Sequence, residues 1–336
     1  MTGTLRAAVL AAVFAALAIA PAQAEPLKIR NAYSSVPGQL VALMPQMPKE
    51  VIRNWGKSYV MEPVFIQGSG PMLQALAAKE VDFVNYGYQS FINGVVEAKL
   101  DLRAVADVLS DKPPNHATAY WVAKDSGINR IEDLRGKKLG INARGSTNEA
   151  ALRKMLGDHG LVDGKDYQIV EARFPALLPA LKSKRVDLAF LVLPFNRMAQ
   201  QSGEFKPLFT MREALGPAQT VILGALGEFV DKNRPALTDY FEDELRMRRF
   251  LYDPRNRIRA LEIASAVAKQ PVATFAEWLF TTADNYRDMS GEIDAALLQK
   301  NVNDLHRLGI TRGTFDVGKY VDLSLVRAAA TRLGGS

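Results

Sequence analysis

The sequence predicts an α/β protein built from two doubly wound units, each with a mainly parallel sheet, followed by helices. From residue 27 to about 112, short apolar runs typical of strands alternate with helical segments, which is the pattern of a parallel sheet covered by helices. The same alternation starts again after Pro113-Pro114 and continues to about residue 215. From about Glu228 the apolar positions follow helical spacing alone. We therefore expect two α/β units, around residues 27–112 and 119–215.

The first unit is expected to contain four strands connected by helices. The strands are expected at residues 27–32, 59–66, 81–84 and 102–109. The helices are expected at residues 40–55, 71–79 and 90–98. Pro45 and Pro48 indicate a broken start for the first of these helices, whereas Pro71 suits the first turn of the second.

The second unit repeats this order, and a returning strand and a helical tail follow it. Its strands are expected at residues 119–123, 138–141, 167–172 and 188–193, with helices at 149–157 and 176–182. The strand expected at residues 221–225 returns the chain to the first unit. Prolines mark the starts of three of the four expected tail helices, which cover residues 235–252, 254–268, 272–280 and 293–308.

Composition excludes several classes of protein. The chain has 336 residues, of which 48% are hydrophobic and 23% charged, so it is neither disordered nor collagen-like nor a coiled coil. Without the leader described next, 336 − 24 = 312 residues remain, enough for about two domains at roughly 150 residues each. The sequence contains no cysteine, which excludes disulfides, thiolate metal sites and cysteine nucleophiles.

The first 24 residues have the organisation of an export signal. Arg6 is followed by the apolar run 7–20 and by Pro21-Ala22-Gln23-Ala24, which ends in an Ala-x-Ala cleavage site. The run is shorter than the roughly 20 residues that a membrane span needs; an uncleaved anchor is the alternative. We expect a mature chain that begins near Glu25, has no lipid anchor because it has no cysteine, and is periplasmic.

Charge and histidine placement argue against nucleic-acid binding, metals and catalysis. The net charge of +6 is spread out, and acidic residues are interleaved even in the arginine-rich stretch 246–259, as on a solvated helix face. His116, His159 and His306 lie far apart and match no metal-ligand spacing. His159 and His306 suit structural roles, while His116 is equally suited to lining a site. We expect no cofactor, no metal, no nucleic-acid partner and a non-enzymatic role.

Two turns are suited to holding an anion. The segment 144–148 (Arg-Gly-Ser-Thr-Asn) follows a strand and opens a helix, and the segment 67–70 (Gln-Gly-Ser-Gly) does the same in the first unit. Free backbone N–H groups and the helix dipole favour an anion at such a position. A plain helix cap is the alternative for either turn alone. Two matched turns at the carboxyl ends of two sheets favour ligand binding in a cleft between them.

Several segments carry a family resemblance over essentially the whole mature chain. Residues 126–128 and 131–140 resemble the "SGI…DLKGKKVA" signature of periplasmic solute-binding proteins, in particular the sulfonate/nitrate/taurine family that feeds ABC importers. Residues 73–83 resemble the "AL..G.vDf" segment of this family, and residues 178–189 resemble its second copy, followed by Pro194. The tail around Gly309 and residues 320–325 is also similar.

The resemblance implies a type II periplasmic binding protein, in which two lobes joined by two hinge strands close on a ligand. It implies that lobe 1 comprises residues 25–118 and 219–336 and that lobe 2 comprises residues 119–218. It also implies a small-molecule ligand, an inner-membrane ABC permease as partner, and a monomer.

Family analogy and local chemistry together give the expected ligand-binding residues. In lobe 1 these are Ser34, Ser35, Gly68, Ser69, Gly70, Tyr86, Gly87 and Tyr88. In lobe 2 they are Tyr120, Arg144, Gly145, Ser146, Thr147, Asn148, Arg173, Phe174, Pro175 and Pro194.

The chemistry of these residues predicts a small organic anion, either an alkyl or aryl sulfonate or an aromatic carboxylate. Arg144 and Arg173 are expected to pair with the anionic group, with surface exposure as the alternative for both. An aromatic wall is expected from Tyr33, Tyr86, Tyr88, Tyr120 and Phe174. Three alternatives stay open: a thiamine-precursor pyrimidine held by stacking, a non-cysteine enzyme on the same fold, and a periplasmic sensor.

Overall fold

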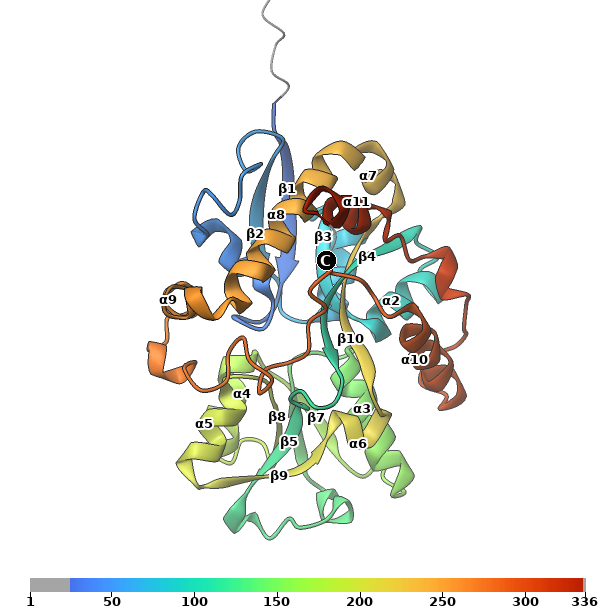
Figure 1. Cartoon of the computed structure of the whole chain (residues 1–336). Coiled ribbons are helices and arrows are strands. Elements are labelled where there is room, and N and C mark those ends of the chain that lie inside the picture. The colour runs from blue at the N-terminus through green and yellow to red at the C-terminus, as the bar shows by residue number, and fades with distance from the viewer. Residues whose placement is uncertain (1–24, 335–336) are drawn as a thin grey trace, which may run out of the picture.

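The computed structural model describes residues 25–334 and contains two five-stranded sheets, each covered by helices (Figure 1). This confirms the predicted α/β fold class with two doubly wound units. We call the first sheet with its helices lobe 1 and the second sheet with its helices lobe 2. The expected leader, residues 1–24, lies outside the described residues.

The sheet of lobe 1 has the strand order β2-β1-β3-β10-β4. Its strands are β1 (Leu27–Tyr33), β2 (Tyr59–Phe65), β3 (Phe83–Gly87), β4 (Leu102–Asp111) and β10 (Ala218–Leu226). Strand β1 pairs in parallel with β2 and β3, and β10 runs antiparallel between β3 and β4. The first three strands therefore end at the same edge of the sheet, where the chain enters α1 (Ser69–Ala77) and α2 (Tyr88–Val96).

The sheet of lobe 2 repeats this arrangement in the order β7-β6-β8-β5-β9. Its strands are β5 (Ala119–Ala123), β6 (Lys138–Ile141), β7 (Gln168–Glu171), β8 (Leu188–Leu191) and β9 (Phe205–Thr210). Strand β6 is parallel to β7 and β8, whereas β5 is antiparallel to β8 and β9. The helices of this lobe are α3 (Thr147–Asp158), α4 (Phe174–Lys182), α5 (Phe195–Ser202) and α6 (Met211–Leu215).

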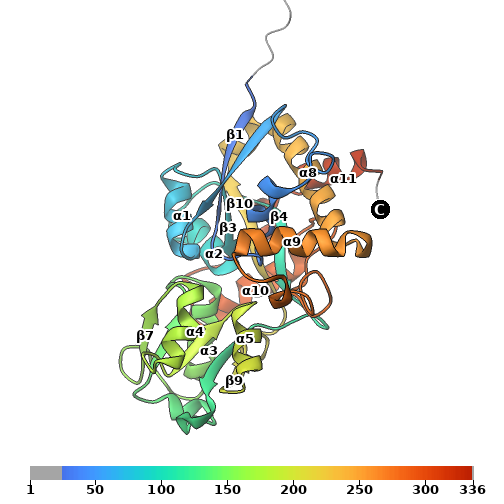
Figure 2. The ribbon, with the colours of Figure 1, turned by 90° about the vertical axis from the view of Figure 1, so that its left-hand side faces the viewer.

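Helices cover both faces of the lobe 1 sheet (Figure 2). Helices α1 and α2 lie on one face, and α8 (Arg234–Tyr252) and α11 (Ser324–Arg332) lie on the other. Tyr240 and Phe241 of α8 pack their rings against Phe83 of β3, so burial of aromatic surface fixes this helix on the sheet. The remaining helices of lobe 1 are α7 (Gly227–Lys232), α9 (Arg257–Ala268) and α10 (Ala295–Arg307).

Two expected helices are wrong in extent. Residues 40–55 form only the 3₁₀ helix η1 (Leu40–Gln46), followed by turns, because Pro48 cannot donate the hydrogen bond that would continue a helix. Residues 272–280 form the short 3₁₀ helix η5 (Val272–Thr274) and turns, although Phe275, Trp278 and Leu279 are buried. Their spacing reflects burial against lobe 1 rather than an α-helix. Strand β9 and helices α5, α6 and α11 had no corresponding expectation.

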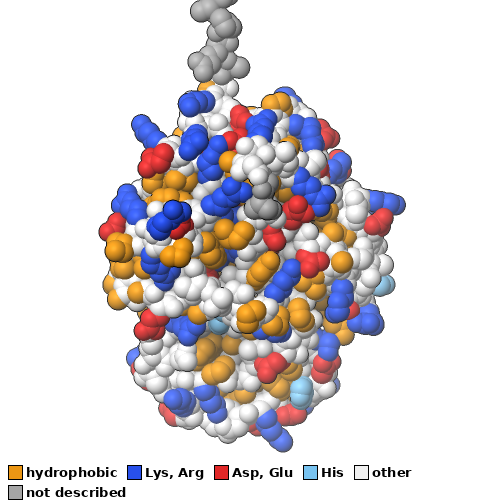
Figure 3. Space-filling view, in the orientation of Figure 1, with side chains coloured by type: hydrophobic (Ala, Val, Ile, Leu, Met, Phe, Trp, Pro, Cys, Tyr) orange, Lys and Arg blue, Asp and Glu red, His pale blue; other side chains and the backbone are white. Residues whose placement is uncertain are grey.

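Two crossovers connect the lobes (Figure 1). Residues 112–118 lead from β4 to β5, and α6 with residues 216–217 leads from β9 back to β10. The exact lobe boundaries, 25–118 with 219–336 and 119–218, remain predictions. Lysine and arginine side chains are interspersed with acidic ones over the face seen in Figure 3. Within residues 25–334, no helix has the length and apolar character that a membrane crossing requires.

Candidate functional site

A pocket of about 90 Å³ lies between the two lobes. It is bounded by the turns that follow β1, β3 and β6 and by the first turns of several helices. The lining residues are Ser34, Ser35, Gly38, Gln39, Ser69, Gly87, Leu109, Thr118, Asn142, Ser146, Thr147, Asn148, Phe174, Phe190, Val192, Leu193, Met211, Thr220, Val221 and Asn285. Both lobes and both crossovers therefore contribute to one site.

The lobe 1 wall is organised by Gln39. Its side-chain carbonyl accepts a hydrogen bond from the backbone N–H of Ser34 at 2.6 Å, and its amide donates to the carbonyl of Asn85 at 3.1 Å. This locks the turn after β1 against the end of β3. The hydroxyl of Ser69 accepts from the N–H of Gly87 at 3.0 Å, which ties the starts of α1 and α2 together.

The lobe 2 wall is the turn between β6 and α3. Ser146 is the N-cap of α3: its hydroxyl accepts from the N–H of Glu149 and donates to the carbonyl of Ala143 at 2.7 Å. Asn148 donates from its amide to the side-chain oxygen of Asn142 at 2.6 Å. The side-chain oxygen of Asn148 is buried and has no hydrogen-bond partner among the described residues. This turn therefore serves both as a cap and as a polar wall.

Several helices begin at the pocket. Ser69 of α1, Thr147 of α3 and Phe174 of α4 line it, as does Gly87, the residue before α2. The first N–H groups of a helix have no intrahelical acceptor, and the helix dipole places positive partial charge there. The pocket therefore has a positive potential suited to an anion, supplied by neutral groups.

The described lining contains no charged side chain, so the two expected arginine contacts need correction. Arg144 points to Asp163 at 2.7 Å and to Glu149 at 3.1 Å and is not in the lining. Arg173 stacks over the ring of Phe65 in lobe 1, at 5.3 Å from the ring centre. Both guanidinium groups therefore contact protein partners, and neither arginine belongs to the lining.

Three of the four tyrosines expected in an aromatic wall are buried in the lobe cores instead. Tyr86, Tyr88 and Tyr120 are each at most 1% exposed, and none of them lines the pocket. Tyr120 stacks on Phe209 with ring centres 4.3 Å apart and donates from its hydroxyl to the carbonyl of Asn148. It supports the polar wall from behind. Tyr33, the remaining expected tyrosine, packs edge-on against Phe65.

The other expected residues divide into lining and supporting groups. The structure brings Ser34, Ser35, Ser69, Gly87, Ser146, Thr147, Asn148 and Phe174 together in the lining. Gly68, Gly70, Gly145, Pro175 and Pro194 lie in adjacent backbone without lining it. The single aromatic side chain of the expected wall that lines the pocket, Phe174, meets Phe190 at a ring distance of 6.3 Å.

Several lining residues had no expectation from the sequence. Gln39 and Asn142 flank expected turns, and a wider window around each turn would have found them. Met211, Thr220 and Asn285 reach the site from segments far along the chain, and their local sequence contains no signal of ligand binding.

The lobes are in direct contact around the pocket. The hydroxyl of Ser90 donates to the carbonyl of Gly145 at 2.7 Å, and the amide of Gln67 donates to the carbonyl of Asn142 at 3.0 Å. Gly87 faces Thr147 so closely that a Cβ on Gly87 would overlap the threonine hydroxyl and lie 3.3 Å from its Cβ. The two lobes therefore touch beside the pocket, and the absence of a side chain at Gly87 permits this close approach.

His116 lies in the first crossover, next to the pocket-lining Thr118. Its Nε2 accepts a hydrogen bond from the amide of Asn196 in α5 at 2.8 Å, which requires a neutral ring. Burial, with Arg197 and Arg212 nearby, lowers the pKa of His116 to about 4. Within residues 25–334 no group of three or more acidic or histidine side chains is placed to hold a metal ion.

We expect His116 to make stability depend on pH. Between about pH 6.5 and 4 the unfolded chain binds a proton at this residue and the folded chain does not, so the free energy of unfolding decreases as the pH is lowered through this range. The decrease due to His116 should approach about 3 kcal/mol. Urea unfolding of the wild type and of His116→Gln, measured across pH 7 to 4, checks this.

The same titration of His159→Gln is the control, because His159 lies at the exposed end of α3. Buried acids such as Asp107, whose pKa is raised by burial, act with the opposite sign but equally in all three proteins. Equal slopes for the wild type and His116→Gln would contradict the expectation.

The chain has two α/β lobes with a pocket between them. Residues 56–241, more than half of the chain, match the family described as NMT1/THI5 like, so the chain belongs to this family.

Solved structures of similar fold include binding proteins and an enzyme. The alkanesulfonate-binding protein SsuA from Xanthomonas axonopodis pv. citri, bound to MOPS, has a TM-score of 0.70 at 17% identity, covering 90% of this chain and 100% of that one. The nitrate-binding protein NrtA from Synechocystis PCC 6803 has a TM-score of 0.70 at 14% identity, covering 92% of this chain and 89% of that one. The desulfurization enzyme DSZB has a TM-score of 0.63 at 13% identity, covering 91% of this chain and 99% of that one.

Proposed function

We propose that this protein is the periplasmic substrate-binding component of an ABC importer, which captures a small organic anion by lobe closure and delivers it to an inner-membrane permease. The observation that carries this proposal is the convergence of several helix N-termini on one pocket whose described lining contains no charged side chain. Membership of the family and the sulfonate-binding and nitrate-binding proteins among its structural neighbours support the same class of function.

The anionic group is proposed to lie against the starts of α1 and α3. Ser69 and Thr147 supply hydroxyls there, and backbone N–H groups supply the remaining donors. No carboxylate belongs to the described lining to repel an anion. A sulfonate or a carboxylate can therefore be held without an arginine, through neutral donors and helix dipoles.

The organic part of the ligand is proposed to occupy the apolar side of the pocket. Phe174, Phe190, Val192 and Leu193 come from lobe 2, and Leu109 and Val221 come from the two strands that lead to and from the crossovers. Burial of apolar ligand surface against these side chains adds affinity. A small alkyl or aryl body suits the volume of about 90 Å³.

A neutral pyrimidine is the second candidate ligand. The lining contains the amide side chains of Gln39, Asn142, Asn148 and Asn285 beside the ring of Phe174. Amides can both donate and accept hydrogen bonds, and an aromatic ring can stack on a heterocycle. This candidate keeps the transport role and changes only the ligand class.

A role in binding rather than catalysis is part of the proposal. The DSZB structure with biphenyl-2-sulfinic acid is of a variant in which a cysteine is replaced by serine, and this chain contains no cysteine. The lining contains no histidine or acidic side chain within the described residues, so its serines have no adjacent base to activate them. Transport and sensing are separated by uptake assays with a reconstituted permease.

A ligand screen tests the proposal. Thermal unfolding of the chain from Glu25 is measured with alkyl and aryl sulfonates, aromatic carboxylates, nitrate and thiamine pyrimidines. A ligand at one hundred times its Kd adds about 2.7 kcal/mol to stability, so a bound anion should raise Tm by several degrees. Small-angle scattering should show that the same anion makes the protein more compact.

The outcomes of this screen and of the scattering measurement test the ligand class, the importer role and lobe closure separately. A response only to pyrimidines replaces the proposed ligand class. No response to any compound contradicts the proposed importer role. Scattering curves that stay identical with and without a saturating ligand contradict capture by lobe closure.

A further inference from the structure

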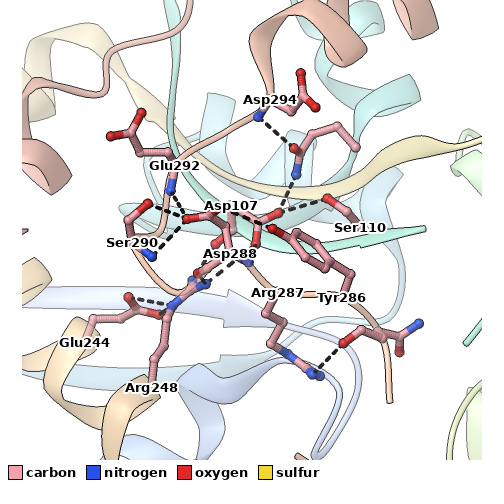
Figure 4. Close-up of polar contacts among 12 residues, drawn as sticks. Asp107, Ser110, Glu244, Arg248, Tyr286, Arg287, Asp288, Ser290, Glu292 and Asp294 are labelled. Carbon is pink, nitrogen blue, oxygen red and sulfur yellow. Dashed lines mark hydrogen bonds and ion pairs between the residues drawn. The ribbon is translucent and has the colours of Figure 1, made fainter. Parts of the chain in front are cut away.

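An extended segment links the ligand pocket to the two strands that lead into the crossovers. Residues 284–294, which we call the strap, lie between η5 and α10 in the sequence and run alongside β4 (Figure 4). The N–H of Ser110 donates to the carbonyl of Tyr286 at 2.8 Å, and the N–H of Asp107 donates to the carbonyl of Gly291 at 2.9 Å. The strap therefore pairs with the last part of β4 before the first crossover.

Asp107 and Gln219 fasten the strap to both strands. The carboxylate of Asp107 on β4 accepts from the N–H of Asp288 at 3.0 Å and from the side-chain amide of Gln219 on β10 at 2.5 Å. Gln219 in turn accepts from the N–H of Asp294 at 3.0 Å. Arg248 of α8 closes the network by donating to the carbonyl of Asp288 at 2.7 Å (Figure 4).

A buried ion pair fixes the other end of the strap beside the pocket. Arg287 and Asp284 lie 2.9 Å apart, and their side chains are 0% and 1% exposed. Arg287 also donates to the carbonyl of Gly38 at 2.9 Å, and the carboxylate of Asp284 accepts from the N–H of Asn285 at 2.7 Å. The pair thus holds two residues that line the pocket, Gly38 and Asn285.

Asn285 differs from the other amides of the pocket because its side chain is not used by the fold. Gln39 is committed to Ser34 and Asn85, and the Asn148 amide donates to the Asn142 oxygen, so each of these side chains makes at least one hydrogen bond, although the Asn148 oxygen itself has no partner among residues 25–334. The side chain of Asn285 makes no hydrogen bond to any residue in the range 25–334. Its N–H₂ and its carbonyl are both available to a ligand, although its backbone is fixed.

We propose that Asn285 orients the polar group of the ligand and helps to set ligand specificity, and that Asp284 and Arg287 are positioning residues that act through it. This inference rests on the proposed function, since it assigns a contact within that pocket. A neutral amide donates to a sulfonate or carboxylate oxygen without adding charge. A carboxylate at the same position would repel such a ligand.

Calorimetry with ethanesulfonate, benzenesulfonate and benzoate tests the contact. Asn285→Ala should weaken binding about ten-fold, as expected for one lost hydrogen bond. Asn285→Asp should weaken binding of these anions at least a hundred-fold at pH 7, because two negative charges then share an enclosed site. Met289→Ala is the matched control, because Met289 is an exposed strap residue outside the lining, and its affinity should equal that of the wild type.

The positioning role is tested by a double-mutant cycle. Asp284→Asn should weaken binding in the wild-type background and have no further effect in the Asn285→Ala background. Urea unfolding of each variant separates a lost contact from a lost fold. Equal losses in both backgrounds would mean that Asp284 has only a structural role.

The failures of the two proposals are distinguishable. If the wild type binds an anionic probe and both Asn285→Ala and Asn285→Asp bind it with the same affinity, this inference alone is contradicted. A wild type that binds none of the three probes contradicts the proposed anion-binding function, and this inference with it.

Discussion

Gly87→Ala should lower ligand affinity about ten- to a hundred-fold while leaving the fold intact. The backbone of Gly87 has φ −67° and ψ 149°, which alanine adopts without strain. The added methyl group would overlap Thr147 of the opposite lobe, so the clash exists only when the lobes are closed. Overpacking costs about 1–3 kcal/mol, and a penalty on the binding-competent state raises the apparent Kd in proportion. Calorimetry with a ligand found in the screen measures the change.

Two further variants make this result specific. Gly157→Ala is the matched control, because open space surrounds Gly157 in α3, and its affinity should not change. Thr147→Ala removes the hydroxyl that clashes. The loss of affinity caused by Gly87→Ala should therefore be smaller in the Thr147→Ala background than in the wild-type background. Wild-type affinity in Gly87→Ala would show that the closed contact between Gly87 and Thr147 is not needed for binding.

Arg248→Ala should lower the free energy of unfolding by about 3–5 kcal/mol. Arg248 is 3% exposed and donates to the carboxylate of Glu244 at 2.7 Å. Its guanidinium also lies 3.6 Å from the carboxylate of Asp107. Without it, two carboxylates remain buried with no cation, and burial already raises the pKa of both. The change is measured by urea unfolding at pH 7.

The loss of stability in Arg248→Ala should decrease as the pH is lowered, because the two uncompensated carboxyl groups then take up protons. Arg255→Ala, which breaks the exposed pair with Asp253, should leave the free energy of unfolding close to that of the wild type, because solvent screens an exposed ion pair. An Arg248→Ala protein within 1 kcal/mol of the wild type would contradict the importance assigned to this network.

The fold class could be predicted because the strands and helices of each unit have recognisable local sequence patterns. The strands at residues 119–123 and 138–141 were expected with the bounds that the structure has, since short apolar runs bounded by turn residues have few alternative structures. The segment 272–280 was misjudged because its apolar spacing is helical while its role is to cover lobe 1 in an irregular path. Burial alone can produce that spacing.

The candidate site was predictable only where a turn follows a strand. Ser34, Ser69 and Ser146 were found in this way, because the carboxyl ends of parallel strands face the cleft. The direction of a side chain is a tertiary property, so Arg144 was expected at the ligand although it pairs with Asp163. Asn285 had no local signal, since its place in the pocket depends on a segment that crosses from the far end of the chain.

The position of β10 between β3 and β4 has a consequence for the order in which the lobes form. All five strands of lobe 2 lie between Ala119 and Thr210, whereas β10 begins only at Ala218. A chain that emerges with its N-terminus first therefore completes lobe 2 while β3 and β4 still lack the strand that joins them. During synthesis of residues 112–226, lobe 1 therefore presents unpaired strand edges, which are surfaces suited to pairing with other chains.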